Sequence, residues 1–254
     1  MISPGVYLVG AGPGDPGLMT VRGMQVLKRA DVVVYDRLVS PEILAEAPSS
    51  AERIYAGKEP GNHRCDQEEI NGLLVRHAQA GRVVVRLKGG DPFLFGRGGE
   101  EALACQEAGI DWEVVPGVTS AVSVPARAGI PVTHRGMSGG FAVVTGHCMA
   151  HDRVDWTALA RIDTVVVLMG LSRLSEIATL LILHGRSAET PAAVISRGTL
   201  PGERVVEGSL GEIAEKVTRE GLVSPATLVV GEVVRLREAL TTEEARLCRA
   251  SHQA

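Results

Sequence analysis

Short aliphatic runs alternate with amphipathic segments through the first 120 residues. The runs have the length of buried strands and are bounded by polar or glycine-rich turns: Val6–Val9, Asp31–Tyr35, Arg53–Tyr55, Val83–Leu87 and Trp112–Val115. Between them, Thr20 is a candidate helix N-cap, and Asp66 with Glu69 forms a capping-box pattern. Strands that alternate with helices in this way predict right-handed crossovers and a parallel sheet.

The second half of the chain begins a new series. Its predicted strands are Phe141–Thr145, Thr164–Leu168, Ala192–Ser196, Arg204–Gly208 and Thr227–Val230, with helices at Arg173–Leu183 and Leu210–Glu220. The sequence Leu-Pro-Gly-Glu at 200–203 is a turn between two short strands, so antiparallel pairing is expected beside parallel pairing.

The break between the two series lies at Pro116–Ser120, before a helix of small residues that runs to Ala128. We therefore expect an α/β protein with two α/β domains, residues 1–117 with a largely parallel sheet and residues 118–240 with a mixed sheet. Residues 241–254 form a polar tail without an apolar stripe.

Composition and charge narrow the class of protein. Hydrophobic residues make up 45% of the chain but aromatic residues only 3%, so the core has to be aliphatic, as in parallel α/β layers. The net charge of −4 argues against a nucleic-acid or anionic-membrane surface, which needs a basic field. Any anionic substrate would need a local cluster of basic residues.

The cysteines and the N-terminus favour a cytoplasmic protein. Cys65, Cys105, Cys148 and Cys248 lie far apart and form no Cys-x-x-Cys pair, so neither a metal nor a disulfide framework is expected. His63 near Cys65, and His147 and His151 around Cys148, lack a second matched pair of ligands. No apolar stretch reaches the roughly 18 residues of a membrane span, and no secretory leader is expected at Met1–Pro4.

Two glycine-rich loops carry the candidate chemistry. Gly10–Gly17 follows the first strand and Gly89–Gly99 follows the fourth, which predicts a ligand at the carboxyl ends of neighbouring parallel strands. Gly10, Gly12 and the later Asp36 also fit part of a dinucleotide fingerprint. However, Asp15 stands at the third glycine position, Pro13 lacks a backbone donor and Pro16 disturbs the helix start, which favours a ligand without phosphate.

At this point the sequence resembles the uroporphyrinogen-III C-methyltransferase family. The resemblance runs from about Val6 to Val234 and is carried by the motifs at Val9–Pro16, Tyr35–Ser40, Arg86–Glu101, Val115–Ser120, Gly129–Gly136, Thr145–His147 and Met169–Gly170. It implies an S-adenosylmethionine-dependent enzyme with two α/β domains, the cofactor between them, S-adenosylhomocysteine as product, and a homodimer.

The resemblance also implies roles for individual residues. Cofactor binding falls on Pro13, Gly89, Gly90, Asp91, Leu94, Thr119, Ser120, Met169, Ala193, Gly198 and Ala226. Acid-base or catalytic roles fall on Asp36, Lys58, Arg97 and Glu100. Because uroporphyrinogen III carries eight carboxylates, Arg97, Arg135 and, secondarily, Arg37 and Arg64 are candidate anchors, with Glu100 as a candidate acceptor of a pyrrole N–H.

Several alternatives stay open from the sequence. Met169 and Ala193 are also suited to an apolar core. Asp36 is also suited to a turn at the end of a strand, and Lys58 to a solvated loop. Glu100 is also suited to the first turn of a helix, where the macrodipole favours an acid. Ser196-Arg197 departs from the Glu-Asn pair of many relatives. The main functional hypothesis is conversion of uroporphyrinogen III to precorrin-2 by two methyl transfers, for sirohaem or cobalamin synthesis. A later corrinoid-precursor methyltransferase and a dinucleotide-binding module are the alternatives. With 254 residues, a fused dehydrogenase and chelatase module is not expected.

Overall fold

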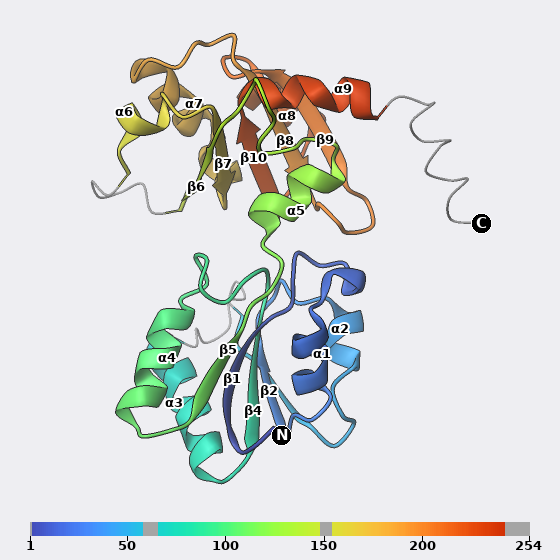
Figure 1. The fold of residues 1–254 in the computed structure, drawn as a ribbon, viewed down its shortest axis with the longest axis vertical. Coiled ribbons are helices and arrows are strands. Elements are labelled where there is room, and N and C mark those ends of the chain that lie inside the picture. The colour runs from blue at the N-terminus through green and yellow to red at the C-terminus, as the bar shows by residue number, and fades with distance from the viewer. Residues whose placement is uncertain (1, 58–65, 148–153, 242–254) are drawn as a thin grey trace, which may run out of the picture. The chain divides into compact units, whose positions relative to one another are not determined.

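The computed structural model describes residues 2–57, 66–147 and 154–241, and the chain divides into two compact units between Thr119 and Ser120 (Figure 1). We call residues 1–119 the N-terminal unit and residues 120–254 the C-terminal unit, and describe each by itself. The predicted tail lies outside the described residues except for Thr241.

The sheet of the N-terminal unit has the strand order β3-β2-β4-β1-β5, and every pair is parallel. Its strands are β1 (Gly5–Gly10), β2 (Val32–Tyr35), β3 (Glu52–Tyr55), β4 (Val83–Lys88) and β5 (Trp112–Val115). This confirms the predicted parallel sheet. Strands β2 and β4 are neighbours in the register Tyr35 to Leu87, so the loops that follow them leave the same edge of the sheet.

Helices cover both faces of this sheet (Figure 1). They are η1 (Pro16–Leu18), α1 (Val21–Leu27), α2 (Pro41–Ala45), α3 (Gln67–Gln79) and α4 (Gly98–Glu107). Alternate residues of β1 enter two different cores. Tyr7 and Val9 pack with residues of α1 and α2, whereas Val6 and Leu8 pack with residues of α3 and α4. The alternation follows the two-residue period of a strand that is buried on both faces.

The predicted helix caps are present. The Thr20 hydroxyl accepts a hydrogen bond from Gly23 N at 3.1 Å. Asp66 Oδ1 accepts from Glu69 N at 2.8 Å, and Glu69 Oε2 accepts from Asp66 N at 3.0 Å, which completes the capping box of α3. Helix α4 was anticipated only through the alternative role of Glu100 in a first helical turn, because two consecutive glycines at its start give little helical signal.

The C-terminal unit has a mixed sheet with the order β6-β7-β10-β8-β9. Its strands are β6 (Phe141–Thr145), β7 (Thr164–Leu168), β8 (Pro191–Ser196), β9 (Arg204–Ser209) and β10 (Ala226–Val230). Only β6 and β7 pair in parallel, and β8 and β9 form an antiparallel pair joined through the predicted turn at 200–203. This confirms the predicted mixed sheet.

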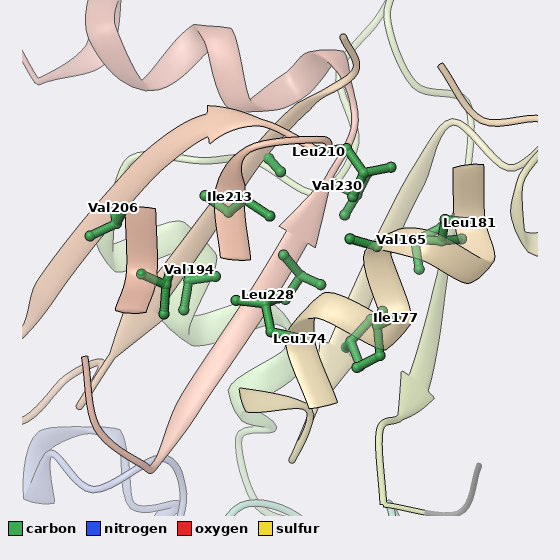
Figure 2. Close-up of a cluster of buried hydrophobic side chains, with 14 of the residues drawn as sticks. Val165, Leu174, Ile177, Leu181, Val194, Val206, Leu210, Ile213, Leu228 and Val230 are labelled. Atoms are coloured by element: carbon green, nitrogen blue, oxygen red, sulfur yellow. The ribbon is translucent and has the colours of Figure 1, made fainter. Parts of the chain in front are cut away.

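The helical segments of the C-terminal unit are α5 (Ser120–Arg127), α6 (Trp156–Leu159), η2 (Leu171–Arg173), α7 (Leu174–Leu183), α8 (Ile213–Glu220), η3 (Glu232–Arg235) and α9 (Leu236–Leu240). Figure 2 shows part of the core between the sheet and helices α7 and α8, where Val165, Val194 and Leu228 meet Leu174 and Ile213. The core is aliphatic, as the composition predicted. Among the described residues, no helix is both long and apolar enough to cross a bilayer.

Candidate active site

Three glycines bring the loops after β1, β4 and β5 into backbone contact. Gly12 and Gly90 exchange two hydrogen bonds, with Gly90 N to Gly12 O at 2.7 Å and Gly12 N to Gly90 O at 3.2 Å. A Cβ atom on Gly117 would overlap the carbonyl oxygen of Gly90. The loops therefore cross at a distance that only glycine at position 117 permits.

Asp91 fastens this crossing with its carboxylate. Its Oδ2 accepts from Gly117 N at 3.1 Å, and its Oδ1 accepts from Phe93 N at 2.8 Å. Both oxygens thus serve the loop structure itself. On the open side of the crossing, Gly90 has φ +70°, and a Cβ built there would meet no atom within 4 Å. The Gly90 backbone is consequently accessible to a ligand, and its conformation favours glycine.

The first glycine loop does not have the geometry of a dinucleotide site. Asp15 caps η1, and its Oδ1 accepts from Gly17 N at 2.8 Å. Helix α1 begins only at Val21, with Thr20 as its own cap. A phosphate held on a helix N-terminus directly after the glycines therefore finds no counterpart in this loop. Pro13, the candidate cofactor residue here, is half-buried beside Gly12.

Asp36 lies directly after β2, beside the second glycine loop. Its Oδ1 accepts from Leu38 N at 3.1 Å, which forms a local turn, and its Oδ2 lies 3.9 Å from Arg86 Nη2. The side chain is 27% exposed. A Cβ on Gly89 would come within 2.7 Å of Leu38 Cβ, so the two loops pack against each other. The structure thus brings Asp36 close to the candidate cofactor loop.

A buried ion cluster, which we define as Arg86, Lys88 and Glu101, lies beneath these loops. Arg86 and Lys88 alternate on β4 and so share a face, and Glu101 comes from α4. Glu101 Oε1 lies 2.9 Å from Arg86 Nε and 3.0 Å from Lys88 Nζ. Glu101 is fully buried, and its Oε2 has no hydrogen-bond partner among the described residues. Burial, followed by the charge of Arg86, lowers the pKa of Lys88.

This cluster was not predicted from the sequence, although a signal was present. Arg86 and Lys88 interrupt an otherwise aliphatic strand two residues apart, which puts two cations on one buried face. Such a pair requires a buried counter-ion. Burial, followed by the charge of Glu101, also raises the pKa of the Cys105 thiol to about 11.

Arg97 and Glu100 form an exposed pair at the start of α4. Arg97 Nε lies 2.8 Å from Glu100 Oε1, and Arg97 Nη2 lies 2.7 Å from Glu100 Oε2. The hydrogen bonds raise the pKa of Arg97 and lower that of Glu100. Arg97 has φ +57°, an uncommon conformation for a residue with a side chain. Glu100 thus occupies the Nε and Nη2 side of the Arg97 guanidinium, and Nη1 can still donate to another acceptor.

The remaining N-terminal candidates are spread around these loops. Leu94 is half-buried between the exposed Phe93 and Phe95, and Arg37 is exposed next to Asp36. Lys58 and Arg64, together with His63 and Cys65, lie outside the described residues. No group of three or more His, Cys, Asp or Glu side chains suited to a metal ion occurs in the described ranges.

In the C-terminal unit, several candidates gather around the ends of β7, β8 and β10. Met169 follows β7 with φ +56° and an exposed side chain, and Ala226 begins β10 opposite Ser196. Ala193 is fully buried on β8. An apolar cavity in this region is lined by Val167, Gly170, Leu171, Leu174, Val194, Ala226 and Leu228.

Gly198 follows β8 in a tight packing site. A Cβ there would overlap Val124 of α5, which explains the need for glycine by packing alone. The residues on either side of it, Arg197 and Thr199, have φ +53° and +68°, so the backbone here is strained. Arg197 belongs to the Ser196-Arg197 pair, at which the sequence departs from many relatives. Thr119 and Ser120 are half-buried at the start of α5, and Arg135 is exposed in the loop before β6.

The chain matches the family model of Tetrapyrrole (Corrin/Porphyrin) Methylases over residues 5–214. It is 50% identical over 237 residues to a uroporphyrinogen-III C-methyltransferase from Methanocaldococcus jannaschii, covering 92% of this chain and 98% of that protein. It is also 50% identical over 237 residues to a siroheme synthase from Thiobacillus denitrificans, covering 92% of this chain but 50% of that protein.

The fold is also similar to a solved structure of known activity. A uroporphyrin-III C-methyl transferase from Thermus thermophilus, crystallised with S-adenosylhomocysteine, matches with a TM-score of 0.79 and 48% identity, covering 91% of this chain and 99% of that one. Together with the family match over most of the chain, these likenesses establish the relationship. The chain belongs to the tetrapyrrole (corrin/porphyrin) methylase family.

Proposed function

We propose that the protein is an S-adenosylmethionine-dependent uroporphyrinogen-III C-methyltransferase that makes precorrin-2 by two successive methyl transfers. The observation that carries this proposal is the 50% identity to the Methanocaldococcus enzyme over nearly the full length of both chains. The product would enter sirohaem or cobalamin synthesis, and the match to part of a siroheme synthase supports the first of these routes.

The glycine loops fit the proposed cofactor. A carbon atom at Gly90 would meet nothing within 4 Å, so the backbone there can approach a ligand closely, while Gly12 and Gly117 fix the loop from behind. In the N-terminal unit, Pro13, Gly89, Gly90 and Leu94 would hold S-adenosylmethionine, and Asp91 would act by fastening the loop. Thr119, the last residue of the N-terminal unit, is also proposed to hold it. In the C-terminal unit, the residues proposed to hold it are Ser120, Met169, Ala193, Gly198 and Ala226.

Bound S-adenosylmethionine would supply an electrophilic methyl group to a pyrrole carbon. The new carbon–carbon bond would form as the sulfur–methyl bond breaks and S-adenosylhomocysteine leaves, and the cationic ring that results must then lose a proton. Asp36 suits this step, because its carboxylate stands at the carboxyl end of a parallel strand and is partly exposed. Lys58 is proposed as a second acid-base group from the resemblance alone.

Arginines are proposed to bind the substrate carboxylates. Arg97 uses Nε and Nη2 for Glu100, which leaves its Nη1 side for a substrate carboxylate. Arg135 and Arg37 are exposed and can each offer a bidentate fork. Glu100, with its lowered pKa, is suited to accept a hydrogen bond from a pyrrole N–H. We further propose that the protein acts in the cytoplasm as a homodimer.

The proposal can be tested by equilibrium binding. Calorimetry should detect S-adenosylhomocysteine binding to the full chain and no comparable binding of NAD, because the loop after β1 lacks the phosphate site of a dinucleotide fold. Preference for NAD would contradict the proposal and favour the dinucleotide-binding alternative. Methylation of an already methylated corrinoid precursor, without methylation of uroporphyrinogen III, would favour the later-pathway alternative.

A further inference from the structure

The buried ion cluster carries an unbalanced charge. Arg86 and Lys88 are cations, and in the part of the chain that the structure describes Glu101 is the one carboxylate that forms an ion pair with both. The contacts of Glu101 with Arg86, Lys88 and Gln67 Nε2 (3.4 Å) are all made by Oε1, while Oε2 is buried without a partner among the described residues. The cluster therefore has one positive charge in excess. The next carboxylate that it reaches is that of Asp36.

Arg86 is held so that one edge of its guanidinium faces Asp36. Its Nε donates to Glu101 Oε1 at 2.9 Å, and its Nη1 lies 3.3 Å from Val34 O and 3.4 Å from Leu87 O. These contacts fix the plane of the group from two sides. The free edge carries Nη2, which lies 3.9 Å from Asp36 Oδ2.

The Asp36 carboxylate consequently has a hydrogen bond at Oδ1 and the charge of Arg86 3.9 Å from Oδ2. Leu38 N fixes Oδ1 through the local turn, and Arg86 attracts Oδ2 from beneath the sheet edge. Because the Arg86 side chain is only 5% exposed, its charge is screened less than that of a surface arginine. Lys88 lies beside the second glycine loop, since a Cβ on Gly96 would lie 3.2 Å from Lys88 Cε.

We propose that Arg86, locked in place by Glu101, is a positioning residue that orients the Asp36 carboxylate toward the bound ring. The inference rests on the proposed function, in which Asp36 acts on the methylated intermediate. Arg86 itself is buried and does not need to touch the substrate. Its effect on turnover should pass through Asp36, and this gives the inference a specific signature.

A double-mutant cycle tests the signature. Arg86→Lys keeps a charge but loses the fork that contacts Glu101 and Asp36 together, and it should lower turnover at saturating substrate about tenfold, within the range of coupling between contacting residues. Affinity for S-adenosylhomocysteine, measured by calorimetry, should change less than about threefold, because the polar contacts of Arg86 are with Glu101, Asp36 and the carbonyls of Val34 and Leu87. In an Asp36→Asn background, Arg86→Lys should lower turnover by no more than about twofold further.

The matched control is Arg186→Lys in the C-terminal unit. Arg186 is also a partly buried arginine whose guanidinium donates to backbone carbonyls, those of Leu159 and Ile162. Its replacement should lower the melting temperature without changing turnover. Melting temperatures of all variants provide a second cycle that does not depend on activity, and Arg86→Lys and Asp36→Asn should shift them non-additively.

The outcomes separate the inference from the function on which it rests. Full independence of the two changes, in turnover and in melting temperature, would overturn the role of Arg86 while leaving the proposed function intact. A fall in turnover that is proportional to the fall in melting temperature, as expected of a partly unfolded variant, would also overturn the role of Arg86. If Arg86→Lys does not fold, Arg86→Gln takes its place, and failure of both to fold would assign Arg86 to stability alone. A wild-type protein that does not methylate uroporphyrinogen III would overturn the proposed function first.

Discussion

Glu100 and Glu101 are consecutive in the sequence but occupy opposite environments. Glu100 is 52% exposed and pairs with Arg97, whereas Glu101 is fully buried and faces Arg86 and Lys88. The difference follows from the phase of α4, which turns one carboxylate to solvent and the next toward β4. The two positions therefore form a natural pair for separating site chemistry from stability.

Glu101→Gln should destabilise the protein far more than Glu100→Gln. Removing the Glu101 charge leaves two buried cations with only the more distant Asp36 carboxylate, 3.9 Å from Arg86, and breaking a buried pair in this way costs about 3–5 kcal/mol. Removing the Glu100 charge breaks an exposed pair worth about 0–1 kcal/mol. Urea unfolding of both variants measures the difference, and equal losses would contradict the assignment of Glu101 as the counter-ion of the cluster.

Cys105 should stay unmodified by iodoacetamide at pH 8 while the protein is folded. It is fully buried, and its pKa is raised to about 11 from 9.0, so the reactive thiolate is scarce. Because the folded-state pKa is the higher one, its contribution to stability is present below pH 9 and is lost as the pH rises toward 11.

Two measurements check this behaviour of Cys105. Peptide mapping by mass spectrometry after alkylation reports which thiols react. Urea unfolding at several pH values should show the wild type losing stability relative to Cys105→Ala between pH 9 and 11. Rapid alkylation of the native protein, or a wild type that gains stability over this pH range, would be incompatible with the buried thiol.

Gly117→Ala should weaken the binding of S-adenosylhomocysteine. The new methyl group would overlap the Gly90 carbonyl, so the loop crossing that Asp91 fastens has to open. Gly99→Ala is the matched control, because a Cβ there meets nothing within 4 Å and alanine favours the helix by up to about 1 kcal/mol. Calorimetry should find a loss of affinity for the first variant alone. Wild-type affinity in a folded Gly117→Ala protein would show that the crossing does not support the cofactor loop.

Position 90 requires glycine for a different reason from position 117. We also expect Gly90→Val to reduce cofactor affinity, but through its φ of +70° and the approach of a ligand, since the protein itself leaves the space open.

Arg97→Ala and Arg135→Ala should impair substrate use and spare the cofactor. Truncating a charge-assisted contact whose partner is left unpaired costs on the order of 2–5 kcal/mol, and we expect the low end for Arg97 because it is exposed. Steady-state kinetics should show the loss in kcat/KM for uroporphyrinogen III. Arg235→Ala is the control, because Arg235 forms a similar exposed pair with Glu232. A loss confined to S-adenosylhomocysteine binding would reverse the assignment.

Much of the fold could be predicted from periodicity and turn chemistry. The aliphatic run at 83–87 and the capping box of Asp66 and Glu69 are local signals, and the structure has a strand and a helix at these places. The start of α4 could not be predicted in this way, because Gly98 and Gly99 carry no helical preference and the helix is stabilised by packing against α3 and the sheet.

The candidate site was only partly accessible from the sequence. Glycine loops and Asp36 stand out because their residue types are unusual after a buried strand. Which of the two glutamates, Glu100 or Glu101, is the buried partner depends on how α4 is rotated against β4. Because both residues are glutamates, the residue type does not distinguish them. The double use of Asp91 is likewise a tertiary property, since Gly117 lies 26 residues further along the chain.

Counting methyl groups on the product tests the central claim most directly. The 254-residue chain is incubated anaerobically with uroporphyrinogen III and S-adenosylmethionine labelled in its methyl group, and the product is analysed by mass spectrometry. We expect a tetrapyrrole that carries two labelled methyl groups bonded to ring carbons, with one S-adenosylhomocysteine released for each. A tetrapyrrole recovered without label, from a protein that is folded and binds S-adenosylhomocysteine, would contradict it.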